Sequence, residues 1–244
     1  MRWLVALAFT LIVAACGGQA RQEVKSTTPS VTDTSVEAGT TTPDLAETTT
    51  PDLAECRRVE ATTGTSSGSY NAPPAMIIDP DVRYTATLDT SCGTIVIDLD
   101  VVNAPIGANN FVFLAREGFY DGLTFHRAVT NFVIQGGDPT GNGAGGPGYT
   151  VVTETPLDGY HVGDIAWAKT AFDEPGTAGS QFFIVTGQAE GLNAAQNAEG
   201  VYDYGAFGHV IEGLDVALLI ESLSPGDGPP VEQVQIVSVS ITES

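Results

Sequence analysis

Apolar and polar positions alternate along two short runs in the first half of the chain. The first run is Tyr84–Thr90, and the second is Thr94–Asp100, in which two isoleucines alternate with a valine and an aspartate. Alternation with a period of two is typical of β-strands that bury one face. The tripeptide Ser91-Cys92-Gly93 separates the two runs, so we predict a β-hairpin.

Two other segments show helical spacing. Pro105 stands where proline is tolerated, in the first turn of a helix, and Gly118 ends the stretch. A second helix is expected from Leu214 to about Leu223, followed by Ser224-Pro225-Gly226. The positions of the first helix that share one face are Gly107, Phe111, Leu114 and Ala115.

The remaining pattern favours a mainly β fold. Short strands and glycine turns fill Leu123–Val210, and Val234–Ile241 is expected to be a final strand. In that strand one face would carry Val234, Ile236, Ser238 and Ser240. Many short strands with two separated helices predict a closed eight-stranded antiparallel β-barrel capped by two α-helices.

The first sixteen residues have the pattern of a targeting segment. One arginine precedes an apolar run from Trp3 to Ala15, which is shorter than the roughly 20 residues that span a bilayer. The ending Val13-Ala14-Ala15-Cys16 resembles a bacterial lipobox. We therefore expect a lipoprotein signal peptide over 1–15, lipidation of Cys16, and an extracytoplasmic protein anchored by lipid to the bacterial cell membrane. An ordinary signal peptide or an uncleaved short anchor are the alternatives.

A polar segment separates this leader from the folded part of the chain. Residues 17–69 contain no Phe, Trp or Tyr, and an eight-residue unit rich in Thr, Pro and acidic side chains occurs twice. Such a composition cannot bury enough apolar surface to offset the entropy of ordering. We interpret 16–70 as the lipidated cysteine with a disordered tether, and 71–244 as the folded domain. A twice-repeated docking motif is the alternative for the tether.

Cysteines and histidines limit the chemistry. An exported chain meets oxidising conditions, and Cys56 and Cys92 remain once Cys16 is set aside, which leaves a disulfide between them open. His126, His161 and His209 are far apart in the sequence, and no cluster has the spacing of metal ligands. We expect no metal site.

The charge excludes several classes of partner. The formal net charge is −21 at pH 7, which argues against nucleic acids and anionic lipid surfaces because phosphate contacts need clustered Lys and Arg. Over 71–244 the only basic side chains are Arg83, Arg116, Arg127 and Lys169. Because basic residues are so few, we interpret the cation between Phe125 and Phe132, Arg127, as a candidate functional residue and not as a casual surface residue.

A glycine-rich stretch follows Arg127. Gly141, Gly143 and Gly146 match the G-x-G-x-x-G dinucleotide fingerprint. That site requires a helix whose N-terminus faces the phosphates. The residues that follow, Pro147-Gly148-Tyr149-Thr150-Val151-Val152, indicate a turn and then a strand, so nucleotide binding is rejected.

The domain resembles a cyclophilin, a peptidyl-prolyl cis-trans isomerase, over about Tyr84 to Ile241. Several long motifs occur in the family's order, which is far more specific than any single short pattern. The motifs that carry the resemblance are Phe125-His126-Arg127, Phe132-Val133-Ile134-Gln135-Gly136-Gly137-Asp138, Gly145-Gly146-Pro147-Gly148-Tyr149, Gly179-Ser180-Gln181-Phe182-Phe183-Ile184 and Phe207-Gly208.

The resemblance implies roles for particular residues. Arg127 would be the catalytic arginine, and Gln135 would contact the substrate backbone and orient it. Phe132, Val133, Phe183 and Leu192 would line the pocket for the proline ring. Ala168, Lys169 and Gln181 would border the peptide groove, and His126 would support the site.

The resemblance also implies the partners and the reaction. Proline-containing segments of unfolded exported proteins would be the substrates, without a metal or other cofactor, and we expect a monomer that touches the membrane only through its lipid. A guanidinium that donates to the prolyl nitrogen would favour the twisted amide, because that nitrogen becomes basic only when amide resonance is lost.

Other interpretations stay open at this point. Phe132, Phe183 and Leu192 could simply be core residues, and Arg127 could be the ion-pair partner of one of the many carboxylates. The domain could also hold proline-containing peptides with little turnover, or the acidic tether could carry the main function.

Three positions depart from the best-studied eukaryotic cyclophilins. Lys169 stands where those have Asn, Gly191 where they have Trp, and Tyr204 where they have His. The segment Lys169–Ser180 is also longer than theirs. These departures bear on peptide preference and inhibitor affinity, and we include Tyr204 among the substrate-binding residues.

Overall fold

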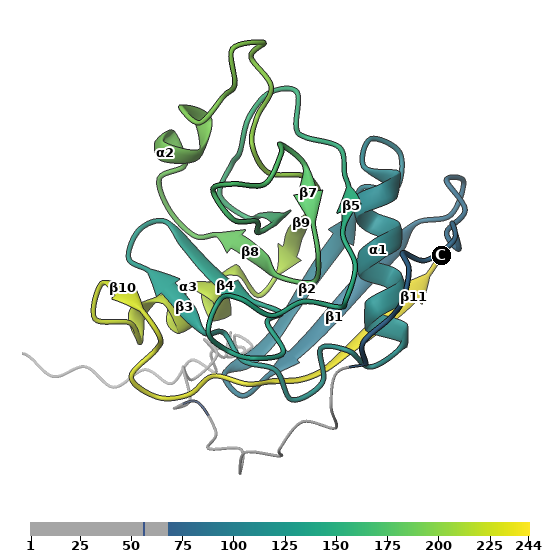
Figure 1. Ribbon diagram of the computed structural model, residues 1–244. Coiled ribbons are helices and arrows are strands. Elements are labelled where there is room, and N and C mark those ends of the chain that lie inside the picture. The colour runs from purple at the N-terminus through teal and green to yellow at the C-terminus, as the bar shows by residue number, and fades with distance from the viewer. Residues whose placement is uncertain (1–55, 57–67) are drawn as a thin grey trace, which may run out of the picture. The chain divides into compact units, whose positions relative to one another are not determined.

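A computed structural model describes Cys56 and residues 68–244 (Figure 1). All of them belong to one compact unit, Thr49–Ser244. The predicted signal peptide over 1–15, the predicted lipidation site Cys16 and nearly all of the predicted tether over 16–70 lie outside the described residues. In the part of the chain that is described, no helix combines the length and apolar character needed to cross a bilayer.

The fold is mainly β, and its principal sheet is antiparallel and curled. The sheet has nine strands in the order β10-β3-β4-β8-β6-β9-β2-β1-β11, and a second sheet pairs β5 with β7. The strands of the first sheet are β1 (Tyr84–Thr90), β2 (Gly93–Leu99), β3 (Arg127–Val129), β4 (Val133–Gly136), β6 (Asp164–Trp167), β8 (Phe182–Val185), β9 (Ala206–Glu212), β10 (Asp227–Gly228) and β11 (Ile236–Glu243). The two strands of the small sheet are β5 (Val151–Val152) and β7 (Thr177–Ala178).

The predicted closed eight-stranded barrel is not confirmed, because the strand order has two ends. Near those ends only a single bridge joins Thr124 to Gln235, supported by hydrogen bonds from Phe125 N to Val234 O (3.0 Å) and from Ile236 N to Leu123 O (2.7 Å). The segment that leads to β11 begins with two prolines at 229 and 230, which have no N–H to donate to a ladder. The sheet therefore curls without closing through paired strands.

Both predicted helices are present. They are α1 (Pro105–Arg116) and α3 (Leu214–Ser222), and α1 begins at its proline as expected. The carboxylate of Glu154 accepts hydrogen bonds from the N–H groups of Ile106 (3.0 Å) and Gly107 (3.2 Å) at its N-terminus. A short third helix, α2 (Glu190–Asn193), was not predicted, because four residues are too few to show helical periodicity.

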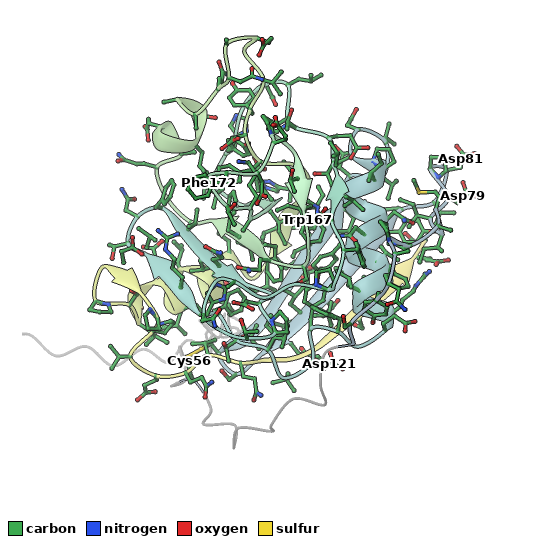
Figure 2. The ribbon with its side chains drawn as sticks, in the orientation of Figure 1. Cys56, Asp79, Asp81, Asp121, Trp167 and Phe172 are labelled. Carbon is green, nitrogen blue, oxygen red and sulfur yellow. A yellow bond between two sulfur atoms is a disulfide. The ribbon has the colours of Figure 1, made fainter. Side chains whose placement is uncertain are left out.

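The main core joins one face of the sheet to the helices α1 and α3 (Figures 1 and 2). Trp167 stacks on Phe207 with ring centroids 4.4 Å apart, and Phe111 lies 5.2 Å from the same ring. Gly107 allows this approach, since a Cβ there would be 3.0 Å from Phe207 Cβ. The apolar face predicted for α1 is thus the face that packs on the sheet.

Strand β8 is apolar on both faces. Phe182 and Ile184 belong to the main core, while Phe183 and Val185 belong to a second apolar cluster. Because side chains alternate across a strand, the second cluster lies on the opposite face of the sheet. This outer cluster carries the residues of the candidate site.

The final strand differs from its prediction. It begins at Ile236 rather than Val234, and its pairing with β1 shifts register between Asp89 and Thr90. The bulge moves the buried position from Ile236 to Val239, and Val237 between them is exposed. The face predicted to carry Val234, Ile236, Ser238 and Ser240 is therefore not one continuous face.

The hairpin of β1 and β2 is confirmed, and it carries a disulfide. The bond joins Cys92, in the turn of the hairpin, to Cys56, with the two Cα atoms 4.1 Å apart. Cys56 is 36 residues earlier in the sequence. The structure thus contains the link that the cysteine count left open.

Candidate active site

The register of four strands gathers the side chains that the sequence singled out. Arg127 in β3 pairs with Gln135 in β4, Gln135 pairs with Phe183 in β8, and Phe183 pairs with Ala166 in β6. Paired residues on adjacent antiparallel strands place their side chains on the same face. A cation, an amide and a phenyl ring thus meet on the outer face of the sheet.

The apolar part of this face is a cluster separate from the main core. Val133, Phe183 and Leu192 are buried in it, and the Tyr204 ring meets Phe183 edge to face with centroids 5.3 Å apart. Its members among the predicted site residues are Phe132, Val133, Ala168, Phe183, Leu192 and Tyr204. Since Phe132 and Tyr204 are only half-buried, the cluster is an apolar surface and not simply an extension of the core.

A chain of polar contacts runs beside this surface. Arg127 Nη1 lies 3.5 Å from Gln135 Oε1, Gln135 Nε2 donates to Gln181 Oε1 (3.1 Å), and Gln181 Nε2 donates to Gly145 O (2.8 Å). The two glutamines therefore connect the guanidinium to the glycine-rich loop. The contact of Gln135 with Arg127 agrees with the orienting role that the family resemblance implied for Gln135.

Arg127 also forms an ion pair that the sequence did not identify. Its Nε donates to Asp227 Oδ1 (2.8 Å), and its Nη2 donates to Asp227 Oδ2 (3.0 Å). The hydrogen bonds from Arg127 hold the pKa of the Asp227 carboxyl below its ordinary value. Arg127 is thus an ion-pair partner, as one of the alternative interpretations expected. A guanidinium has five N–H donors, and Asp227 accepts from only two of them, so three remain for other partners.

The predicted groove residue Lys169 is held within the protein. Its side chain is only 3% exposed, and Nζ lies 2.9 Å from Asp203 Oδ1. The ammonium also donates to Asp173 O (3.1 Å) and lies 5.4 Å from the centre of the Tyr204 ring. Lys169 therefore ties its loop to the edge of the apolar surface.

A groove adjoins the polar chain. Its volume is about 660 Å³. Its walls come from the glycine-rich loop, from the residues that follow β6 and from the segment before β8. Among the predicted site residues it is lined by Gln135, Ala168, Lys169 and Gln181. Ala168 belongs to both sets, so the groove begins at the edge of the apolar surface.

His126 is near the site but differs from its neighbours. It precedes Arg127 in the chain and is half-buried, and its two ring nitrogens complete no hydrogen bond within the described residues. Burial lowers the pKa of the ring, and the adjacent Arg127 lowers it further against the opposing effect of Asp138. A half-buried imidazole next to Arg127 fits a supporting position.

The glycine-rich loop is organised around the carboxylate of Asp138, and no helix follows it. The next regular element is the two-residue strand β5. This arrangement confirms that the fingerprint-like glycines form a turn before a strand. Within 68–244 and Cys56, no group of three or more His, Cys, Asp or Glu side chains is placed to hold a metal ion.

Comparisons with known proteins give the class. A family model described as cyclophilin type peptidyl-prolyl cis-trans isomerase matches residues 85–241. Peptidyl-prolyl cis-trans isomerase B of Bacillus subtilis is 44% identical over 126 residues, which cover 51% of this chain and 78% of that protein. An isomerase of Schizosaccharomyces pombe is 37% identical over 154 residues, covering 62% of this chain and 94% of that protein.

A solved structure agrees with these sequences. The crystal structure of a cyclophilin type peptidyl-prolyl cis-trans isomerase from Cryptosporidium parvum aligns with a TM-score of 0.57 at 27% identity, over 66% of this chain and 99% of that chain. The protein described here belongs to the cyclophilin family and is a peptidyl-prolyl cis-trans isomerase.

Proposed function

We propose that isomerisation takes place on the outer face of β3, β4, β8 and β6, with Arg127 as the catalytic donor. The observation that carries this proposal is the register that places Arg127 and Gln135 beside the buried Phe183. The proline ring of the substrate would occupy the apolar surface formed by Phe132, Val133, Phe183 and Leu192.

The physical basis is the loss of amide resonance during rotation. Rotation about an Xaa-Pro bond crosses a barrier of roughly 18–20 kcal/mol, and the uncatalysed exchange takes tens to hundreds of seconds. In the twisted state the prolyl nitrogen is pyramidal and can accept a hydrogen bond. A donor that bonds to it there, and not in the planar amide, lowers the barrier through differential binding of the transition state.

The surroundings of Arg127 suit this role. The planar fork of an arginine can be held by second partners while other N–H groups remain for the substrate. The adjoining apolar surface excludes water, which strengthens a hydrogen bond to the reacting nitrogen. Gln135 and Gln181 would contact the peptide backbone, Ala168, Lys169 and Tyr204 would border the groove, and His126 would support Arg127.

An assay on an Xaa-Pro tetrapeptide tests the role of Arg127. In a protease-coupled measurement we expect Arg127→Ala to lower kcat/KM by about two to three orders of magnitude, as loss of a transition-state donor does elsewhere. Arg83→Ala is the matched control, because Arg83 is another arginine in an exposed ion pair, with Asp98. Equal activity of Arg127→Ala and the wild type would contradict the catalytic role, and undetectable wild-type activity would favour a peptide-holding module.

We further propose that the enzyme acts outside the cytoplasm on exported proteins. The apolar run up to Ala15 and the lipobox-like ending at Cys16 support a lipid anchor, and the polar tether would let a monomeric domain reach unfolded segments near the membrane. A disulfide between Cys56 and Cys92 is compatible with that compartment.

A further inference from the structure

We propose that Asp227 is a positioning residue that orients Arg127 for the reaction, an inference that rests on the catalytic role proposed for Arg127. Its carboxylate contacts Nε and Nη2 on one edge of the guanidinium. The nitrogen that it does not contact, Nη1, lies 3.5 Å from Gln135 Oε1 and carries a second N–H. Asp227 thereby fixes the plane of the fork and leaves that second N–H of Nη1 for the substrate.

The backbone around Asp227 adopts a conformation that only glycine favours. Gly226 and Gly228 have φ values of 148° and 149°, a region that L side chains rarely enter. A Cβ on either glycine would meet open space. A steric clash is therefore not the reason why these two positions favour glycine. They are needed for the backbone path that presents Asp227 to β3.

The same segment is fastened to the strand that carries Arg127. Asp227 and Gly228 pair with Val129 and Ala128 as the short strand β10. Ser224 Oγ donates to the carbonyl of Ala128 (2.9 Å). Further along, Thr130 N donates to Gly226 O (2.8 Å). These contacts set the position of the carboxylate relative to the arginine backbone.

A carboxylate of α3 extends this attachment to the turn between β3 and β4. Glu221 is buried, and its Oε1 accepts a hydrogen bond from Asn131 N (2.7 Å). Asn131 has a positive φ of 56° and directly precedes Phe132. The chain from Glu221 to Gly228 therefore holds both the polar and the apolar parts of the site, and Asp227 is its contact with the arginine side chain.

Positioning, rather than stability, is the expected contribution of the pair. The side chains of Arg127 and Asp227 are 38% and 60% exposed, and exposed ion pairs contribute little to folding stability. A long arginine side chain otherwise samples many rotamers, and misplacement of a reacting group by about 1 Å can lower a rate 100-fold. A bidentate partner restricts that motion.

Asp227→Ala, measured with the tetrapeptide assay, tests the inference. We expect kcat to fall about tenfold with KM changed less than about twofold, and an unchanged melting temperature. Asp227→Asn retains an acceptor for Nε and should recover part of the loss. Asp98→Ala removes the carboxylate from the comparable Arg83 pair and should leave kcat unchanged. An unchanged or raised kcat in Asp227→Ala would overturn the inference.

A second arm separates positioning from a general structural effect. In an Arg127→Lys background, which lacks the guanidinium fork, Asp227→Ala should cause no further loss of kcat. In the single variant Asp227→Ala, which keeps Arg127, the Nε–H proton of Arg127 should exchange with solvent faster than in the wild type. An equal loss in both backgrounds, or unchanged exchange, would contradict positioning. If Arg127→Ala keeps full activity, the proposed function itself fails; if only Asp227→Ala is neutral, the failure belongs to this inference alone.

Discussion

Asp138 is the residue that shapes the glycine-rich loop beside the site. The residue is 1% exposed. Its carboxylate accepts hydrogen bonds from Thr140 N (2.7 Å), Thr140 Oγ1 (2.8 Å), Asn142 N (2.9 Å) and Gly143 N. A Cβ on Gly145 would fall 2.1 Å from Asp138 Oδ1. Burial alone would raise the pKa of this carboxyl, but the hydrogen bonds from Thr140, Gly143 and Asn142 outweigh it and lower the pKa.

Replacement of Asp138 should destabilise the protein and change its response to acid. We expect Asp138→Ala to lower the free energy of unfolding by about 2–3 kcal/mol at neutral pH, because buried backbone donors lose a charged acceptor. Since the folded pKa lies below the ordinary 3.8, this contribution is present above pH 3.8 and disappears as the pH falls through the folded value.

Urea unfolding of both proteins at several pH values measures this effect. The difference between wild type and Asp138→Ala should shrink below about pH 4. Asp158→Ala, at an exposed carboxylate of the loop after β5, is the control. A difference that stays constant down to pH 2 would show that the charge of Asp138 is not the source.

At the scale of elements, features with a local sequence pattern could be predicted, whereas pairings between distant strands could not. The hairpin of β1 and β2 and the helices α1 and α3 are confirmed because their signals lie within a few residues. The pairing of β4 with β8 was not predictable in this way, since about fifty residues separate Gln135 from Phe183. The site residues on those strands came from family motifs instead.

The ion pair between Asp227 and Arg127 could not be predicted from the sequence. Asp227 is 100 residues from its partner Arg127, and it directly follows Ser224-Pro225-Gly226, which the sequence indicated only as the end of the second helix. Nothing local distinguishes it from the other carboxylates of an acidic domain. The bulge in β11 was missed for a related reason, because a shift in register depends on the partner strand.

The loop that begins at Lys169 depends on a half-buried ion pair. Lys169→Met should lower the free energy of unfolding by about 1–3 kcal/mol, because it removes the hydrogen bonds from the charged ammonium to backbone carbonyls and leaves the Asp203 carboxylate without this ion pair. Hydrogen exchange should quicken in residues 170–178, which include the exposed Phe172 (Figure 2). Arg83→Met, at an exposed pair, is the control and should change stability much less. Unchanged exchange in 170–178 would contradict the anchoring role of Lys169.

At the scale of the whole molecule, two apolar surfaces share one curled sheet. One side packs against α1 and α3 and stabilises the fold, and the outer side carries the Phe183 cluster and Arg127. The apolar residues of β4 and β8 follow from this arrangement, because both faces of these strands contribute to an apolar cluster. Sequence patterns identify such strands as buried, but they do not say which face is the core.

The proposed anchor makes a prediction for the whole chain in a bacterial host. Mass spectrometry of the membrane fraction should find the peptide that begins at Cys16 carrying lipid, and a bond between Cys56 and Cys92. Cys16→Ser should move the protein out of the membrane fraction, whereas Cys56→Ser with Cys92→Ser should leave it there. Retention of Cys16→Ser in the membrane would favour an uncleaved apolar anchor instead.

The central claim is that Arg127 accelerates rotation and does not merely help to bind the peptide. Exchange spectroscopy at saturating Xaa-Pro peptide measures the interconversion on the enzyme, apart from affinity. Wild type should interconvert the cis and trans forms many times per second, and Arg127→Ala should bind the peptide while its exchange falls by about two to three orders of magnitude. Exchange at the wild-type rate in saturated Arg127→Ala would contradict the account.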